Sequence, residues 1–293
     1  MKAMILAAGL GTRLRPLTDN RPKALVEVAG RTLLEITLAR LRTFGISEVI
    51  VNVHHFADMV TDYLKSNKNF GMRIEISRED VLLDTGGGLK KAAWFFLEDP
   101  SRLDEPFLLH NVDVISTIDF KRMLQFHKDN QALATLAVQS RETSRYLLFN
   151  DHLQLCGRRA GRDAKPELVC LPAANSLRER TALPSAEARA DCHSERSEEP
   201  AFSESRAGRS APLQSLAFSG IHVISPRLLP MLTEEGVFSI IPSYLRLSAQ
   251  GEKILAFRAD QYYWRDLGRP ADLSQAAHDL QQNVVLNPRH ADS

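Results

Sequence analysis

The sequence has few of the features that mark exported, membrane-spanning or nucleic-acid-binding proteins. Only three cysteines occur among 293 residues, and their number and spacing suit neither disulfide pairing nor a metal site. No apolar run approaches the roughly 20 residues of a membrane-spanning helix. The formal net charge of +1 gives no general attraction to nucleic acid or anionic lipid. We therefore expect a cytoplasmic protein with neither membrane nor nucleic-acid partners.

Several known motifs are also missing. No Gly-Lys pair occurs, which excludes a P-loop, and Leu14 stands where a dinucleotide fingerprint needs its third glycine. No Gly-x-Ser-x-Gly elbow is present, so serine hydrolase chemistry has no support. Arg13 and Arg15 follow the first apolar run at once, where a secretory signal would need a cleavage region. His54, His55 and His110 lack metal-site spacing and are interpreted as packed histidines at strand ends.

The most informative stretch covers residues 4–25. An apolar run over 4–8 predicts a buried strand, which opens into Gly9-Leu10-Gly11-Thr12-Arg13 and is followed by Pro22-Lys23. Glycine lets backbone N–H groups approach phosphate oxygens closely. Arg13 can donate two hydrogen bonds to one phosphate, and Lys23 supplies a compact charge. The stretch predicts a phosphate-binding turn; a plain strand-to-helix turn is the alternative.

Strand-like and helix-like patterns alternate along the chain. Strands are expected at 49–53, 72–76, 107–109, 216–224 and 253–258, and helices at 33–44, 56–64, 89–97, 240–249 and 270–282. This alternation predicts a single α/β, Rossmann-like domain over 1–282 with a mostly parallel mixed sheet flanked by helices. Ligands of such sheets lie beyond the carboxyl ends of the strands, where the Gly9 turn and Asp113 are expected.

One segment, at about 158–212, departs from this pattern. It is rich in Arg, Glu, Ser, Ala and Pro and has few large apolar residues, which predicts a disordered insertion. A regulatory arm that folds on a partner is the alternative. Removal of residues 160–210 is expected to leave folding and activity largely intact. The tail over 283–293 is expected to be frayed.

The opening stretch, Leu6 to Leu14 followed by Pro22-Lys23, resembles the signature of the sugar-1-phosphate nucleotidyltransferases. The resemblance covers residues 1 to about 156 and about 213–282. It implies that a nucleoside triphosphate (UTP or GTP) and a sugar-1-phosphate react, with Mg²⁺ held by Asp113 and Asp266. Mg²⁺ suits such a site because it prefers carboxylate and phosphate oxygens. The implied catalytic residues are Arg13, Lys23 and Asp113. The implied nucleotide contacts are Leu6, Ala8, Gly9, Gly11, Thr12, Arg13, Lys23, Thr85, Gly86 and Gly87, and the implied sugar contacts are Asn111, Ser219 and Gly220.

Within that family, the segments 84–88 and 218–221 most resemble the bacterial N-acetylmuramate-1-phosphate uridylyltransferases. The mannose-1-phosphate guanylyltransferases share much of the pattern, so GTP with mannose-1-phosphate or a heptose-1-phosphate stays open. A non-catalytic nucleotide-sensing subunit and a metal-dependent glycosyltransferase are the alternatives of other classes. Two departures from the family occur. Val112 stands where glycine is frequent, and no Glu-Lys-Pro segment precedes residue 216 to anchor the sugar phosphate. Arg145 and Arg265 are candidates for that anchor, with solvated surface arginines as the alternative.

Overall fold

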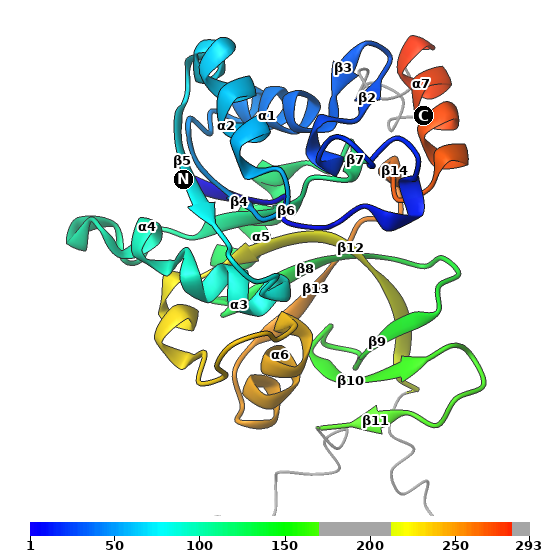
Figure 1. Ribbon diagram of the computed structural model, residues 1–293. Helices are drawn as coiled ribbons and strands as arrows, with labels where there is room; N and C mark the ends of the chain where they lie inside the picture. Colours follow the sequence, from blue (N-terminus) through cyan, green and yellow to red (C-terminus); the bar gives the residue numbers. More distant parts are fainter. Residues whose placement is uncertain (170–211, 283–293) are drawn as a thin grey trace, which may run out of the picture.

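The computed structural model describes residues 1–169 and 212–282, and it has a ten-stranded mixed sheet between two layers of helices (Figure 1). The main path of the sheet runs β11-β10-β9-β12-β6-β1-β4-β5, and β8 joins it beside β12 and carries β13. The bounds of these strands are Lys2–Leu6 (β1), Glu48–Val53 (β4), Arg73–Arg78 (β5), Phe107–Asn111 (β6), Ala134–Gln139 (β8), Arg145–Phe149 (β9), Leu155–Ala160 (β10), Glu167–Leu168 (β11), Gln214–Ile224 (β12) and Ile254–Arg258 (β13).

The half of the sheet made of β5, β4, β1 and β6 is parallel. Two helices, α1 (Leu33–Thr43) and α2 (Ala57–Ser66), connect its strands as crossovers, as the alternating pattern predicts. The Thr32 hydroxyl caps α1 by accepting the Glu35 N–H at 3.1 Å. The other half is largely antiparallel, because β12 runs against β6, β8 and β9. The predicted fold class, an α/β mixed sheet flanked by helices, is confirmed.

The two faces of the sheet pack against different helices (Figure 1). Side chains alternate along β1, so Ala3 and Ile5 belong to one core while Met4 belongs to the other. The first core includes residues of α1, α2, α5 (Phe120–Asp129) and α7 (Pro270–Gln281). The second includes residues of α3 (Asp84–Lys91), α4 (Ala93–Leu97) and α6 (Ile240–Ala249). Two cores on opposite faces leave the strand ends free to carry polar groups.

Short elements surround the carboxyl ends of the parallel strands. Two single-turn 3₁₀ helices, η1 (Thr12–Leu14) and η2 (Lys23–Leu25), follow β1. A small antiparallel pair, β2 (Glu27–Val28) and β3 (Arg31–Thr32), leads into α1. A second pair joins β7 (Val114–Ser116) to β14 (Trp264–Asp266) and thereby connects segments 150 residues apart in the chain. The remaining 3₁₀ helices are η3 (Lys68–Gly71), η4 (Pro100–Arg102) and η5 (Pro226–Met231).

Two sequence predictions need correction. The helix expected over 89–97 is two helices, because α3 already begins at Asp84 and α4 begins after a break at Ala92. The predicted start of the insertion, at about 158, is too early in the chain. Strand β10 continues to Ala160 and pairs with β9, and β11 then pairs with β10. Composition does not reveal this hairpin because backbone pairing, rather than apolar burial, orders it. A deletion starting at residue 160 would therefore remove β11; most of the insertion and the 283–293 tail lie outside the described residues.

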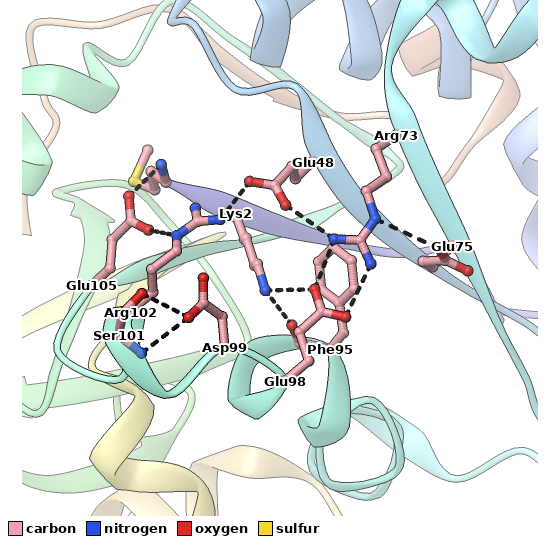
Figure 2. A network of polar contacts seen from close by, with 11 residues as sticks. Lys2, Glu48, Arg73, Glu75, Phe95, Glu98, Asp99, Ser101, Arg102 and Glu105 are labelled. Atoms are coloured by element: carbon pink, nitrogen blue, oxygen red, sulfur yellow. Dashed lines mark hydrogen bonds and ion pairs between the residues drawn. The ribbon is translucent and has the colours of Figure 1, made fainter.

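An ion-pair network lies at the amino ends of the parallel strands, opposite to their carboxyl ends (Figure 2). Lys2, Glu48 and Arg73 are the first residues of three neighbouring strands. The buried Lys2 ammonium donates to Phe95 O at 2.6 Å and to Glu98 Oε1 at 2.8 Å, and Arg73 donates to both Glu98 oxygens. This network stabilises the edge that lies away from the carboxyl ends described next.

Candidate active site

Two cavities meet at the carboxyl ends of β1 and β6, and Arg13 and Asn111 line both of them. We name them after the contacts predicted from the sequence: the smaller, of about 450 Å³, is the nucleotide cavity, and the larger, of about 1250 Å³, is the sugar cavity. The predicted residues that line the nucleotide cavity are Leu6, Ala8, Gly9, Gly11, Thr12, Arg13, Lys23, Thr85, Asn111 and Asp113. Those that line the sugar cavity are Arg13, Asn111, Ser219, Gly220 and Asp266. The fold thus brings most of the predicted site to one place.

Strand register explains why the turn after β1 meets the end of β6. Leu6 and Asn111 are paired neighbours on parallel strands, and the Val112 N–H donates to Leu6 O at 3.1 Å. Gly11 then adopts a left-handed conformation (φ 65°) ahead of η1, where a β-carbon would lie 2.9 Å from the Thr18 methyl group. The chain can therefore turn sharply and present Arg13 over the cavity junction.

The two predicted carboxylates converge through the β7–β14 pair. Asp266 pairs with Val114, the neighbour of Asp113, and the Leu267 N–H donates to Asp113 O at 2.7 Å. Burial raises the pKa of Asp266, and the charge of Asp113 raises that pKa further, while Lys23 and Arg13 act in the opposite direction. The pair of aspartates is therefore a partly buried site of negative charge, with two cations beside it.

Gly268 allows Arg13 to lie against this acidic pair. The Gly268 N–H donates to Asp266 Oδ1 at 2.7 Å. A β-carbon on Gly268 would come within 2.5 Å of Arg13 Nη2 and 2.6 Å of Asp266 Oδ1, distances that no side chain could accept without movement. The guanidinium consequently occupies the place that a side chain would fill.

Lys23 forms an ion pair with Asp113, and its side chain is only 9% exposed. A buried ammonium and carboxylate need each other, since either alone would carry a large desolvation penalty. Among residues 1–169 and 212–282, no cluster of three or more His, Cys, Asp or Glu side chains could hold a metal ion. Two carboxylates nevertheless fit Mg²⁺, which is usually bound by one or two carboxylates plus phosphate and water. The raised pKa of Asp266 fits as well, because a cation would offset both the burial of its charge and the repulsion by Asp113 that raise it.

Two buried side chains that were not predicted from the sequence, Asn52 and Glu79, also line the nucleotide cavity. Asn52 Oδ1 accepts the Ala7 N–H at 2.7 Å, and Asn52 Nδ2 donates to Glu79 Oε1 at 2.6 Å. Glu79 Oε2 in turn accepts the Leu83 N–H at 2.9 Å. This chain of hydrogen bonds fixes the start of the phosphate-binding turn relative to the loop before α3. The one available signal was a polar residue, Asn52, inside an apolar strand.

Gly86 and Gly87, predicted as base contacts, do not line either cavity. Their N–H groups donate to Phe238 O, and β-carbons there would lie 2.3 Å from the Phe238 ring and 2.5 Å from Gly236 O. Thr85 does line the nucleotide cavity, and its hydroxyl also accepts the Ile240 N–H at 3.0 Å. The glycines therefore allow α3 to pack closely against the segment before α6, and their contact with a base stays a prediction.

On the sugar side, Gly220 adopts φ 73° and a β-carbon there would lie 2.8 Å from Asn111 Nδ2. Val112, which stands where glycine is frequent in the family, lines the nucleotide cavity and does not line the sugar cavity. Both candidate phosphate anchors line the sugar cavity; Arg145 is exposed there, and Arg265 is paired with Asp279 at 3.2 Å. Their contact with the sugar phosphate stays a prediction.

His54 and His110 are packed as expected, whereas His55 is exposed and the expectation was wrong for it. His110 is buried and its Nδ1 lies 2.7 Å from Asn111 O; burial lowers its pKa to about 4. His54 Nδ1 lies 2.9 Å from Glu79 O. In the part of the chain that the structure describes, no helix has the length and apolar character needed to cross a bilayer.

This edge site, with a glycine turn, cations and two carboxylates at the ends of parallel strands, defines an α/β protein suited to phosphorylated ligands. Residues 2–147 match the family model described as "Nucleotidyl transferase", and the chain belongs to that family. It is 52% identical over 101 residues to N-acetylmuramate alpha-1-phosphate uridylyltransferase of Caulobacter vibrioides, covering 33% of this chain and 42% of that protein.

A second relative is the mannose-1-phosphate guanylyltransferase catalytic subunit beta of Dictyostelium discoideum. It is 36% identical over 148 residues, covering 50% of this chain and 40% of that protein. The chain thus spans less than half the length of either relative. Among solved structures, a putative glucose-1-phosphate thymidylyltransferase from Bacillus anthracis superposes with a TM-score of 0.66 at 17% identity, covering 97% of this chain and 96% of that one. This last likeness concerns the fold.

Proposed function

We propose that this chain transfers a nucleoside monophosphate from a nucleoside triphosphate to a sugar-1-phosphate and releases pyrophosphate. The observation that carries the proposal is the junction of the two cavities. Arg13 lines both of them, and the Lys23–Asp113 ion pair and Asp266 lie beside it. Two anionic substrates that enter from opposite sides would meet at this junction.

In the proposed reaction, a phosphate oxygen of the sugar-1-phosphate attacks the α-phosphorus of the triphosphate. The new P–O bond forms as the bond to the β-phosphate oxygen breaks, and the electron pair leaves with pyrophosphate. The nucleophile is already anionic, so no general base is needed; positioning and charge stabilisation carry the rate. Arg13 would stabilise the departing pyrophosphate, and Lys23 the phosphates next to Asp113.

Asp113 and Asp266 are the residues that would hold Mg²⁺, which when bound neutralises phosphate charge. This role also accounts for the two carboxylates better than the alternatives do. A nucleotide sensor without catalysis would have no need of both aspartates, and a glycosyltransferase would have no need of the Gly–Arg–Lys turn. We therefore favour an enzyme that makes a nucleotide sugar, acting in the cytoplasm.

For the acceptor we favour N-acetylmuramate-1-phosphate, with UTP as the donor. The sugar cavity is lined by eight Arg or Lys side chains and four carboxylates. This excess of positive charge suits a sugar that carries a carboxylate in addition to its phosphate. N-acetylmuramate has such a group and mannose lacks it. GTP with mannose-1-phosphate is the second candidate, because the guanylyltransferase relative matches a longer part of the chain.

The test is a grid of the four ribonucleoside triphosphates against several sugar-1-phosphates with Mg²⁺, read as pyrophosphate release. We expect the highest kcat/KM for UTP with N-acetylmuramate-1-phosphate. A maximum at GTP with mannose-1-phosphate would select the second candidate. No pyrophosphate with any pair, from protein that binds nucleotide, would favour the sensor.

A further inference from the structure

Arg141 and Arg159 share an unusual environment in the wall of the sugar cavity. Each guanidinium lies over an aromatic ring, Arg141 at 3.7 Å from the Trp264 centroid and Arg159 at 5.7 Å from that of Tyr146. Each Nε is buried without a hydrogen-bond partner, and neither residue has a carboxylate within ion-pair distance among the described residues. Two half-buried cations thus have no ion-pair partner among the described residues to offset their desolvation.

The neighbouring arginines differ in this respect. Arg158 is paired with Glu167 at 2.7 Å, and Arg162 with Glu142 at 2.8 Å. Glu142, the carboxylate that lines the same part of the wall, is therefore already engaged. Burial lowers the pKa of Arg141, although Asp266 acts in the opposite direction. Arg145, which also lines the sugar cavity without an ion pair among the described residues, is exposed, so Arg141 and Arg159 are distinguished by being both unpaired and half-buried.

Both side chains are held in place by neutral groups. Arg141 Nη2 donates to Phe218 O at 2.7 Å, and Arg159 Nη2 donates to the Ser215 hydroxyl at 3.0 Å. Together with the aromatic contacts, these bonds fix the orientation of each guanidinium before any ligand binds. Little side-chain freedom then remains to be lost on binding, which favours affinity.

The two arginines belong to the wall of the sugar cavity. They also line an adjoining hollow of about 380 Å³, which none of Arg13, Asp113 and Asp266 lines. A 1-phosphate that reacts beside Arg13 would leave the rest of the sugar ring directed toward this hollow. An anionic group there would have to be a second one, separate from the phosphate.

We propose that Arg141 and Arg159 form a subsite for a carboxylate carried by the sugar ring of the acceptor. The proposal rests on the function proposed above and names the residues that select the acceptor. A guanidinium matches a carboxylate with two parallel hydrogen bonds, and it stacks on aromatic faces as both side chains do here. The subsite gives the cavity a preference for acidic over neutral sugar-1-phosphates.

Two substrates isolate the effect. N-acetylmuramate-1-phosphate and N-acetylglucosamine-1-phosphate differ by the lactyl ether that bears the carboxylate. We expect the unmodified protein to prefer the acidic sugar by about 10- to 100-fold in kcat/KM, the range of a charged hydrogen-bonded contact. In Arg159→Gln and Arg141→Gln this ratio should fall to within about threefold of unity, with kcat/KM for the neutral sugar nearly unchanged.

The matched control is Arg227→Gln, which removes one exposed arginine that is paired with Glu252 and lines none of the cavities. It should keep the full preference. An unchanged ratio in both cavity variants, or an equal loss for the two sugars, would overturn the proposal; the latter would mean contact with the 1-phosphate or a folding defect. If the unmodified protein turns over neither sugar, the acceptor proposed above fails, while nucleotidyl transfer itself is tested by the full grid of substrates. Calorimetric Kd values for the two sugar phosphates then decide the subsite alone, and equal values would refute it.

Discussion

Replacing Gly268 by alanine should separate the two groups that this glycine allows to meet. The added methyl group would lie 2.5 Å from Arg13 Nη2 and 2.6 Å from Asp266 Oδ1. An ordinary contact needs about 3.4 Å or more, so the guanidinium or the carboxylate must move by roughly 1 Å. A displacement of this size at a reacting centre costs about 10²-fold in rate. We therefore expect kcat for pyrophosphate release to fall by about that factor.

The fold should tolerate the same substitution. The atoms in conflict belong to side-chain ends, and one of them is the flexible tip of Arg13. The thermal midpoint of Gly268→Ala should correspond to a stability change within about 1 kcal/mol, the usual effect of glycine-to-alanine at a compatible position. A large loss of stability would mean that the activity result reports unfolding.

A double-mutant cycle tests the cause. If the methyl group acts mainly by displacing Arg13, Gly268→Ala should have little further effect in an Arg13→Ala background, where the guanidinium is already gone. The measurement is kcat at saturating substrates for the four proteins of the cycle. Strictly additive losses, or a single variant with normal kcat, would refute the idea that this glycine exists to seat Arg13.

Two further predictions concern the same edge of the sheet. Lys23→Ala and Asp113→Ala should each lower turnover by about 10²-fold or more, since each removes a charge from the reacting phosphates; near-normal rates in both would refute the site. Glu79→Gln should raise KM for the triphosphate by roughly tenfold with a smaller effect on kcat, because it weakens the hydrogen bonds from Asn52 and Leu83 that position the turn. A change in kcat alone would contradict that role.

The sequence predicted the parallel half of the fold and the position of the phosphate-binding turn for a simple reason. Both depend on local signals: an apolar run of strand length, a glycine turn and cations close to it in the chain. The expected strand over 49–53 and the helix over 240–249 correspond to β4 and α6. Local patterns of this kind are set by residues a few positions apart, so they are visible without the structure.

The pairing that brings the two aspartates of the site together was harder to predict from the sequence. Asp113 and Asp266 meet because β7 pairs with β14, two strands of three residues each that carry no distinctive pattern. The resemblance to a family named both aspartates, but periodicity alone would not have brought them together. Arg141 and Glu79 were not predicted, because their roles depend on burial and on hydrogen bonding in the folded chain. The Arg141 Nε is buried without a hydrogen-bond partner, whereas the Glu79 carboxylate accepts the Leu83 N–H.

The network at the opposite edge of the sheet gives a prediction about stability that is independent of the site (Figure 2). Hydrogen bonds from Arg73 first, and then from Lys2, lower the pKa of Glu98 from 4.5 to about 2. A carboxyl group whose pKa is lower in the folded than in the unfolded protein contributes its full stabilisation at pH values above the unfolded-state pKa. That stabilisation is lost as the pH falls from about 4.5 toward 2.

Glu98→Gln should therefore destabilise the protein at pH 7 by about 1–2 kcal/mol, since it leaves the buried Lys2 ammonium without its carboxylate. The difference from the unmodified protein should stay constant down to about pH 5 and then shrink, as denaturant titrations at each pH would measure. Glu75→Gln is the control, because the ion-pair partner of Glu75 among the described residues is Arg73 alone, at 3.7 Å, and exposed pairs contribute little. If Glu98→Gln lowers the free energy of unfolding by the same amount at pH 7 and pH 3, the loss comes from altered packing and not from the missing charge. Pyrophosphate release at pH 7 should be unaffected in both variants, because the amino ends of these strands lie across the sheet from the cavities.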